Sequence, residues 1–463
     1  MRMRIITTML IIPILSACTM APGYIRPAAP VPAEWPKGAA YKEQTGSAEN
    51  HDLAWQKYFC DERLKRVIEL ALSNGRDLRI AALNVEKARA LYGIQRAELF
   101  PAISAVGVMN RERVPADLSN TGGAYISDYY SVDAGVLSWE LDVFGRIRSL
   151  KDKALEQYLS TEYTRRAVEV SLISSVATAY LVLAADRENL RLAESTLKAQ
   201  NETYDLVQRR YTAGISSELD VKRAQTQVET AKSNVSLYTR VVALDENSIN
   251  LLAGAVIPKD LLSETFSDIA PPKALSAGMS SEVLLNRPDV LSAEHQLRAM
   301  NANIGAARAA FFPRISLTST IGTGSTELSR LFSAHSAAWT FAPQIVAPIF
   351  DARLWSGLKG VKIDREMAVA QYEKTIQTGF KEVADALAFQ GTIESQLAAQ
   401  ESLVKASSDA YSLSNIRYSS GIDSYLNVLD AQRSLYAAQQ GLIATRLTDF
   451  TSRVILYKAL GGR

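Results

Sequence analysis

The pattern of polar and apolar positions first predicts helices. Residues 61–98 and 281–310 carry apolar side chains at helical spacing, so each segment is predicted to form one helix. Both segments run into a Phe-Pro pair, at Pro101 and Pro313. Proline ends a helix and favours extended backbone before it. The chain after each pair is therefore expected to be extended.

Two strands are predicted after the helix in each half of the chain. Ile315, Leu317 and Ile321 alternate with serine and threonine, and this period of two is typical of a strand with unlike faces. A second alternating run lies within 336–350. The first half is less regular, but Tyr130, Val132, Ala134 and Val136 fit the same alternation. Each half is expected to hold two strands joined by a loop rich in glycine, serine and threonine.

Very long helices are predicted to follow the strands. Gly214 is the only glycine between Ile147 and Gly254, and that stretch contains no proline. It allows a helix of about 66 residues, roughly 100 Å long at ~1.5 Å per residue, then a turn and a shorter return helix. The second half repeats this over 352–460, with its turn at Gly421. Such helices are typical of a coiled coil or the wall of a tube.

One part of the first long helix has a competing interpretation. Residues 167–185 are apolar enough to suggest a transmembrane helix. Their counterpart in the second half, 374–392, contains Lys374, Lys381 and Asp385. Because duplicated elements should occupy equivalent surroundings, we expect a buried helix face instead.

The halves are related by an internal duplication. Residues 210–228 and 417–435 are identical at 9 of 19 positions, where about one is expected by chance. An earlier pair of segments, 74–104 and 286–316, agrees at eleven positions with a constant spacing of 212. The chain therefore consists of one unit repeated.

These patterns divide the chain into five segments. Residues 1–17 are predicted to be a signal peptide, and residues 18–60 an anchor and extended tether rich in proline. Repeat 1 covers 61–254 and repeat 2 covers 281–463, each with a helix, two strands, a long helix and a return helix. Residues 255–280 link the repeats.

The amino terminus predicts export and lipidation. Arg2 and Arg4 precede a compact apolar run that ends in Leu-Ser-Ala-Cys at Cys18. This ending resembles the bacterial lipobox, in which the cysteine becomes acylated. Diacylglycerol and an N-acyl chain such as palmitate on Cys18 would form a firm anchor. Thr19 replaces the aspartate that usually retains lipoproteins at the inner membrane, so the outer membrane is the expected location.

Composition adds few further candidates. Without Arg2 and Arg4 the 51 basic residues fall to 49, equal to the 49 acidic ones, and nothing suggests a nucleic-acid partner. If Cys18 is lipidated, Cys60 is the one remaining cysteine and a disulfide framework is impossible. The three histidines lack metal-ligand spacing, and no catalytic arrangement is evident. We expect no enzyme, no metal site and no cofactor beyond the covalent lipid.

The predicted strands raise the question of closure. Four strands cannot close a membrane barrel, which needs about eight, and open edges are not tolerated in hydrocarbon. Residues 315–326 and 336–350 contain no charged side chain. If the strands enter a membrane, two or three chains must pool them. The alternatives are a helical protein with a small sheet, a periplasmic adaptor without a pore, and a lipoprotein enzyme.

Three stretches resemble the TolC-like outer-membrane efflux proteins, most closely the OprM-like lipoproteins. They are Trp-Glu-Leu-Asp-Val-Phe-Gly-Arg at 139–146, Ile-Gly-Ala-Ala-Arg-Ala-Ala-Phe-Phe-Pro at 304–313 and Tyr-Leu-Asn-Val-Leu-Asp-Ala-Gln at 425–432. The resemblance implies a mainly α-helical homotrimer in which twelve pooled strands form an outer-membrane β-barrel above a periplasmic α-barrel. The linker would lie in its equatorial region. It also implies a passive efflux duct, docked to a periplasmic adaptor and an inner-membrane pump of the resistance-nodulation-division type.

The resemblance assigns a periplasmic gate near the two glycine turns, Gly214 and Gly421. Leu426 and Asp430 are four residues apart and share a helix face, so a trimer would turn each into a ring. They match the constriction residues of the family. Asn427 stands where the family has a second aspartate.

The resemblance also assigns a network that holds the aperture shut, formed by Asp220, Tyr418 and position 423. Here Asp423 stands where the family has arginine, so two carboxylates would repel unless Arg210 or Arg417 bridges them.

Simpler roles remain open for these residues. Ser217 with Asp220, and Ser424 with Asn427, have the spacing of a capping box. Leu426 fits an ordinary core position.

The cargo is the least determined property. Multidrug ducts and copper or silver ducts share the architecture that the resemblance implies. Eight methionines and three histidines without clusters favour drugs over soft metals.

Overall fold

The structure is a computed structural model that describes residues 19–41, 54–120, 122–273 and 280–462. The predicted signal peptide and Cys18 lie outside these residues. The chain forms two compact units. The first unit contains 84–162, 292–372 and the start of the chain, and the second contains 29–83, 163–291 and 373–463. Helices α4 (Arg76–Ala97), α5 (Arg146–Thr212), α7 (Pro288–Ala309) and α8 (Ala352–Ser419) each contribute to both units.

The helix predicted over 61–98 is interrupted. Helix α3 (Glu62–Asn74) ends at Gly75, and α4 (Arg76–Ala97) begins directly after it. Gly75 takes a non-helical ψ of 121°, and a Cβ there would lie 2.5 Å from the Ala71 carbonyl oxygen. Glycine therefore permits the break. A four-residue helix, α2 (Trp55–Tyr58), precedes α3 within the segment predicted as tether.

The helix predicted over 281–310 is also divided. A 3₁₀ segment, η4 (Ser281–Asn286), comes first, and α7 (Pro288–Ala309) follows. Pro288 occupies the first helical position, where its missing amide hydrogen costs nothing.

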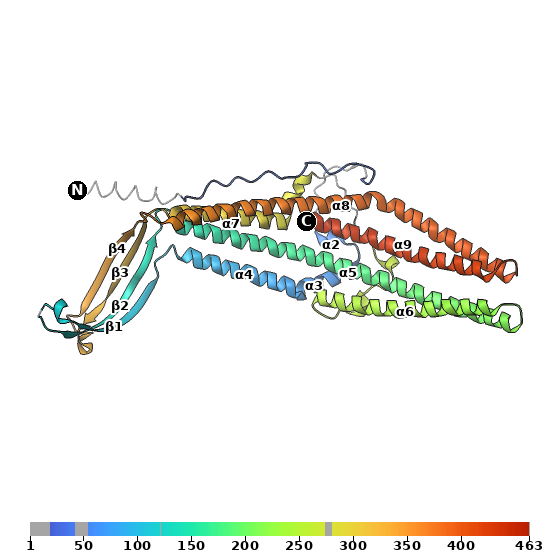
Figure 1. The fold of residues 1–463 in the computed structure, drawn as a ribbon, viewed down its shortest axis with the longest axis horizontal. Coiled ribbons are helices and arrows are strands. Elements are labelled where there is room, and N and C mark those ends of the chain that lie inside the picture. Colours follow the sequence, from blue (N-terminus) through green and yellow to red (C-terminus); the bar gives the residue numbers. More distant parts are fainter. Residues whose placement is uncertain (1–18, 42–53, 121, 274–279, 463) are drawn as a thin grey trace. The chain divides into compact units, whose positions relative to one another are not determined.

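The four predicted strands form one antiparallel sheet in the first unit, in the order β1-β2-β3-β4 (Figure 1). Their bounds are β1 Ile103–Val114, β2 Tyr125–Leu141, β3 Arg314–Ser325 and β4 Ala337–Val346. Short 3₁₀ turns lie between the members of each pair, η1 at Ala116–Leu118 and η5 at Leu328–Arg330. The sheet thus joins one hairpin from each repeat.

The long helices are confirmed. Helix α5 (Arg146–Thr212) has 67 residues and α8 (Ala352–Ser419) has 68. Their return helices are α6 (Glu218–Ala253) and α9 (Tyr425–Ala459). In Figure 1 each return helix runs back beside its long partner.

The apolar stretch of α5 packs in the core of the second unit. α5 is long and apolar enough to cross a membrane, yet half of its most apolar window is buried within the protein. Val176, Tyr180 and Leu181 are at most 1% exposed and pack in one core with residues of α3, α6 and α9. The expectation of a buried helix face is confirmed for these residues.

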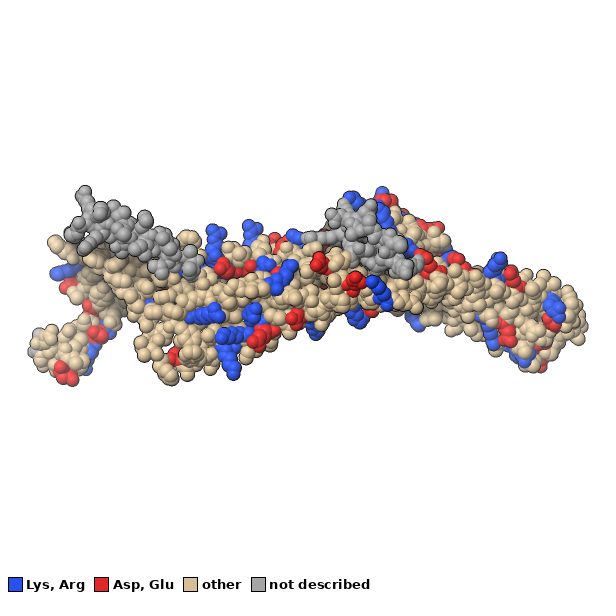
Figure 2. Space-filling model, turned by 90° about the horizontal axis from the view of Figure 1, so that it is seen from above, with Lys and Arg blue, Asp and Glu red and all other residues tan. Residues whose placement is uncertain are grey.

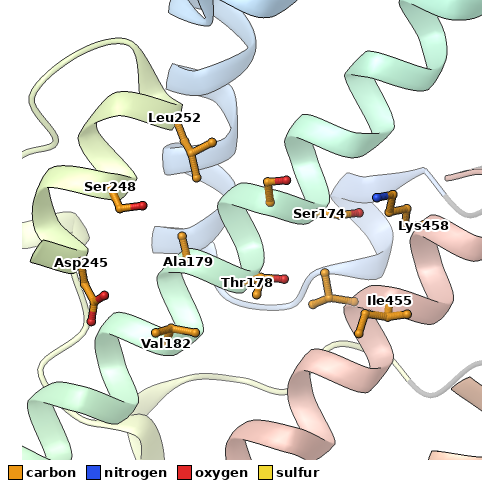
Figure 3. A pocket seen from close by; sticks show the side chains of 11 residues that line it. Ser174, Thr178, Ala179, Val182, Asp245, Ser248, Leu252, Ile455 and Lys458 are labelled. Carbon is orange, nitrogen blue, oxygen red and sulfur yellow. The ribbon is translucent and has the colours of Figure 1, made fainter. Parts of the chain in front are cut away.

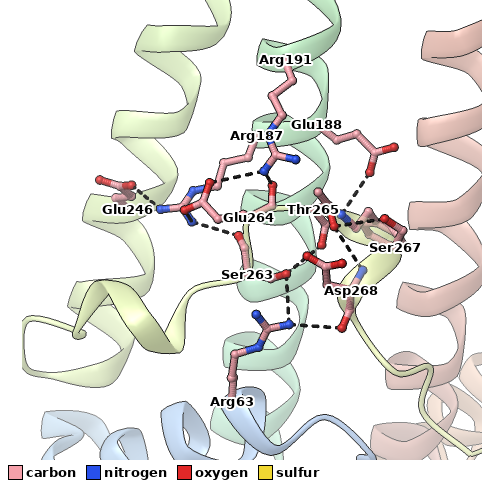
Figure 4. Close-up of polar contacts among 11 residues, drawn as sticks. Arg63, Arg187, Glu188, Arg191, Glu246, Ser263, Glu264, Thr265, Ser267 and Asp268 are labelled. Atoms are coloured by element: carbon pink, nitrogen blue, oxygen red, sulfur yellow. Dashed lines mark hydrogen bonds and ion pairs between the residues drawn. The ribbon is translucent and has the colours of Figure 1, made fainter.

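The linker between the repeats is fastened to α5 and α3 in the second unit (Figure 4). It contains the turns η2 (Lys259–Leu261) and η3 (Phe266–Asp268). Arg187 of α5 donates to the Ser263 carbonyl oxygen at 2.9 Å and pairs with Glu246 of α6 at 2.8 Å. Arg63 of α3 donates to the Asp268 carbonyl oxygen at 3.1 Å. These charge-assisted contacts hold the linker at defined points.

A buried arginine ties the start of α7 to two other helices. The Arg287 side chain is 6% exposed and lies 2.8 Å from the carboxylate of Asp289 in α7 and 2.8 Å from that of Glu382 in α8. It also donates to the carbonyl oxygen of Ala459 at 2.6 Å, at the end of α9. One guanidinium thus connects α7, α8 and α9 within the second unit.

We expect Arg287→Ala to lower stability by about 2 kcal/mol, because it removes several charge-assisted hydrogen bonds and leaves the Ala459 carbonyl unpaired. Arg353→Ala is the matched control, since its pair with Asp351 involves an arginine side chain that is 90% exposed. Thermal unfolding of the detergent-solubilised protein measures both. Equal melting of the two variants would contradict this role for Arg287.

Candidate functional site

The sheet has one apolar face and one polar face. On β3 and β4 the cross-strand pairs Ile315–Ile345, Leu317–Pro343 and Ile321–Trp339 project to one side. The pairs that alternate with them project to the other side, and they are Ser316–Gln344, Thr318–Ala342 and Thr320–Thr340. Trp339, Phe341 and Ile345 are all more than 60% exposed. A large apolar surface is thus left uncovered by the chain itself.

A bulge keeps β2 in phase with these faces. The register with β3 shifts between Val136 and Trp139, so β2 advances three residues while β3 advances two. Without the extra residue, Trp139 and Leu141 would turn to the polar side and Glu140 to the apolar side. The irregular pattern of the first repeat is therefore the mark of the bulge.

Both outer strands of this sheet have an open edge. Among the described residues, β1 pairs with β2 and β4 pairs with β3. Each therefore presents a row of unpaired backbone groups. Pro343 lies in β4, a position that proline tolerates because an edge strand does not need every amide hydrogen.

In the membrane barrel that the family resemblance implies, the apolar face meets hydrocarbon, where an arginine costs about 2–4 kcal/mol. We therefore expect Ile321→Arg to prevent accumulation of the folded protein in the outer membrane. Thr320→Arg is the matched control, since Thr320 is adjacent on the same strand and faces the polar side. Outer-membrane fractionation and native electrophoresis measure both variants. Normal assembly of Ile321→Arg together with loss of Thr320→Arg would reverse the assignment of the faces.

The two helix hairpins end in the same turn. Gly214 and Gly421 both have φ of +75°, which glycine adopts without strain. The amide of Ile215 donates to the Arg210 carbonyl oxygen at 2.8 Å, and the amide of Ile422 donates to that of Arg417 at 2.9 Å. This is the Schellman pattern of a helix end. The duplication thus extends to the backbone of the turns.

An aromatic cluster lies beside these turns in the second unit. Tyr418 and Tyr425 are 7% and 2% exposed, and their ring centroids are 5.4 Å apart. The Arg210 guanidinium lies over the Tyr418 ring, 4.7 Å from its centroid. Burial raises the pKa of both tyrosines, so both stay neutral. The contacts join the α5–α6 hairpin to the α8–α9 hairpin, and Tyr425 is a member that the sequence did not single out.

The two aspartates of the predicted network have different partners. Arg417 donates to Asp423 at 2.6 and 3.1 Å, and this contact lowers the pKa of Asp423. Asp220 instead forms the predicted capping box with Ser217. Among the described residues its ion pair is with Arg223, at 3.8 Å. Neither Arg210 nor Arg417 therefore bridges the two aspartates within this chain.

The second predicted capping box is not formed. Ser424 precedes α9, but its side chain accepts no capping hydrogen bond. The Asn427 side-chain amide instead donates to the Asp423 carboxylate. The start of α6 is thus capped and the start of α9 is not.

The predicted gate residues share an exposed face of α9. Leu426 is 42% exposed, and Asn427 and Asp430 are also exposed, whereas Val428 and Leu429 are buried. The simpler reading of Leu426 as a core residue is therefore wrong for the single chain. An apolar and an anionic side chain stand one helical turn apart on a surface that the chain leaves open.

A groove of about 440 Å³ lies between α5, α6 and α9 in the second unit (Figure 3). Ser174 and Thr178 line it from α5, Asp245 and Ser248 from α6, and Lys458 from α9. Burial, and then the neighbouring Asp186 carboxyl, raises the pKa of Asp245 from 3.8 to about 6. The sequence did not predict this pair of carboxyls.

We expect Asp245→Asn to stabilise the protein at pH 8 by about 1 kcal/mol, a figure reduced for the solvent that reaches the carboxyl. A raised pKa favours the folded state below pH 4, and this contribution is lost as the pH rises through about 6. The advantage of the variant should therefore disappear at pH 4. Thermal unfolding from pH 4 to 8 measures it, with the exposed Asp409→Asn as control. A pH-independent difference would contradict the assignment.

The surface of the helices carries both positive and negative side chains. Figure 2 shows Lys and Arg interspersed with Asp and Glu over the helices on the face that it presents.

Comparisons with known proteins agree with this architecture. The family described as "Outer membrane efflux protein" matches residues 67–255 and 279–462. The antibiotic efflux pump outer membrane protein ArpC and the toluene efflux pump outer membrane protein TtgC, both of Pseudomonas putida, are each 49% identical over 97% of this chain and 93% of the relative. The open-state crystal structure of the MtrE outer membrane channel of Neisseria gonorrhoeae is similar with a TM-score of 0.85. It is 36% identical and covers 96% of this chain and 98% of that one.

Proposed function

Because the chain belongs to the outer membrane efflux protein family, we propose that it forms a passive exit duct through the outer membrane as one subunit of a homotrimer. Three four-stranded sheets would pool into a twelve-stranded barrel. The long helices would form an α-barrel in the periplasm. The protein is an outer-membrane channel component and not an enzyme.

The observation that carries this proposal is the two-faced sheet with its open edges. The apolar face suits hydrocarbon and the polar face suits a water-filled lumen. Open edges are not tolerated in a bilayer, so β1 of one copy must pair with β4 of the next. A ring of copies satisfies both requirements.

The duct would operate with two partners and a lipid anchor. A periplasmic adaptor and an inner-membrane pump of the resistance-nodulation-division type would deliver cargo and open the periplasmic end. Acyl chains on Cys18 would hold the amino terminus at the outer membrane. Efflux relatives that span nearly the whole chain support the pump partnership, and the sequence around Cys18 supports the anchor.

Organic compounds are the proposed cargo. The relatives at 49% identity carry antibiotic and toluene efflux in their names, which favours drugs and solvents over copper or silver.

Channel activity tests the proposal directly. The purified protein should behave as a trimer in mild detergent and raise the conductance of planar bilayers in discrete steps. Expression beside its pump in a strain that lacks an outer-membrane duct should restore efflux of an antibiotic. A monomer without conductance, with strand residues accessible to water-soluble probes on both faces, would overturn the proposal.

The gate is proposed at the exposed face of α9. In a trimer Leu426 would form an apolar ring and Asp430 an anionic ring, with Asn427 between them. The turns at Gly214 and Gly421 would lie at the periplasmic tip. Contacts of Arg210 with Tyr418 and of Arg417 with Asp423 would restrain the two hairpins, with Asp220 capping α6.

We expect Leu426→Ala and Asp430→Ala each to raise single-channel conductance severalfold and to sensitise cells to vancomycin, because each removes one ring from the constriction. Asp409→Ala is the control, since Asp409 is exposed on α8 and outside the tip cluster. If both α9 variants show the same leak as the unmodified protein and still conduct, the gate assignment is wrong and the proposed duct stands.

A further inference from the structure

The start of the described chain lies along α7 in a fixed register within the first unit. Arg308 donates to the Met20 carbonyl oxygen at 3.2 Å, and Asn301 donates to that of Pro22 at 2.7 Å. Between these contacts Ala21 packs on Gly305, where an added Cβ would lie 2.6 Å from the Ala21 nitrogen. Each step along the tether corresponds to about one turn of α7. The tether therefore cannot slide along the helix without losing these contacts.

A buried carboxylate fixes the other end of this register. The Glu294 side chain is 2% exposed and pairs with Arg26 and, at 2.7 Å, with Arg298. Tyr24 donates to Glu294 at 3.2 Å, and its ring lies under the Arg298 guanidinium. These contacts hold the segment that leads to residue 19 in place.

The tether begins at an apolar groove of about 590 Å³. Thr19, Met20 and Ala21 line one part of it. The rest is formed by the last turn of α7, the residues just beyond it and the start of α8, namely Arg308, Phe311, Phe312, Trp355 and Leu358. A volume of this size is in the range of ligand sites.

The aromatic walls of the groove are supported by other rings. Phe311 packs edge-on against Trp355 at 5.1 Å, and Phe312 stacks on Phe144 at 4.9 Å. Trp355 and Leu358 are three residues apart and share a face of α8. Trp355 nevertheless remains 68% exposed. A large aromatic surface thus stays uncovered directly beside the first described residues.

We propose that this groove holds one acyl chain of the lipid attached to Cys18. The inference rests on the lipid anchor proposed above. Cys18 precedes Thr19, and consecutive Cα atoms are only about 3.8 Å apart, so a lipid on Cys18 starts beside the groove. The apolar and aromatic walls remove methylene groups from water, and Arg308, the charged residue of the lining, already donates to the Met20 carbonyl oxygen.

Covalent attachment favours this occupant over a free phospholipid or a second copy of the chain. The tether register fixes the attachment point, which gives the linked acyl chain a high effective concentration at the groove. Residues 19–21 of the same chain already form one wall, so the linked acyl chain has the shortest path of entry. The groove would thereby fix the depth at which the anchor meets the helices.

Photocrosslinking in intact membranes tests this inference. Cells grown on a fatty acid that carries a diazirine and an alkyne would incorporate it into the anchor. After irradiation, the peptide with Cys18 should be joined to a peptide that contains Phe311 or Trp355. Trp355→Ala combined with Leu358→Asn should lower the yield of this adduct at least fivefold. Phe350→Ala, a change at a side chain that is 88% exposed and outside the groove, should leave it within twofold.

Several outcomes would overturn the inference. The first is that the crosslinked peptides carry only free phospholipid. The second is that, in trimers mixed from isotopically light and heavy chains, the adducts join two different chains and not two parts of one chain. The third is that Cys18 carries no lipid. Native electrophoresis verifies that each variant assembles. Conductance of the same preparations reports on the duct separately, so its loss would count against the proposed function and a missing adduct against the groove.

Discussion

Unpaired backbone on β1 and β4 is the constraint on which the assembly depends. Hydrogen-bonding groups cannot remain open in hydrocarbon, and a sheet with only four described strands cannot curl enough to pair its own edges. The bulge before Trp139 keeps β2 in phase with the apolar and polar faces of the sheet. These two faces become the outside and the inside of a barrel only when the sheets of neighbouring copies close a ring. The membrane barrel is therefore a property of the assembly, and folding of one sheet is a step toward it.

The helical part depends on a different constraint, because very long helices need packing contacts along their length to stay folded. Helices of 67 and 68 residues need continuous support, and the second unit supplies it through a core in which α3, α5, α6 and α9 meet. Arg287 and the fastened linker add polar contacts at the places where the repeats join. The exposed face of α9 remains uncovered, which leaves Leu426 and Asp430 available to the interior of an assembly.

The sequence predicted the features that depend on local pattern. The absence of proline and of any glycine but Gly214 identified α5, the duplication extended that prediction to α8, and alternation identified β3 and β4. The helix break at Gly75 was missed, because an isolated glycine is also tolerated within helices. The bulge of β2 was seen only as irregularity, since an extra residue destroys the period of two. Contacts across the duplication, such as Arg210 on Tyr418, depend on tertiary packing that spacing along the chain does not encode.

The unequal starts of the return helices give the two hairpins different resistance to fraying. The Asp220 amide at the beginning of α6 donates to both the hydroxyl and the carbonyl oxygen of Ser217, whereas the equivalent Asn427 amide of α9 donates to the Ser424 carbonyl oxygen and receives no side-chain cap. A lost cap costs about 1 kcal/mol, so the first turn of α9 unwinds at lower cost. The two repeats thus differ in one side-chain hydrogen bond, and the more easily deformed hairpin is the one that carries Leu426 and Asp430.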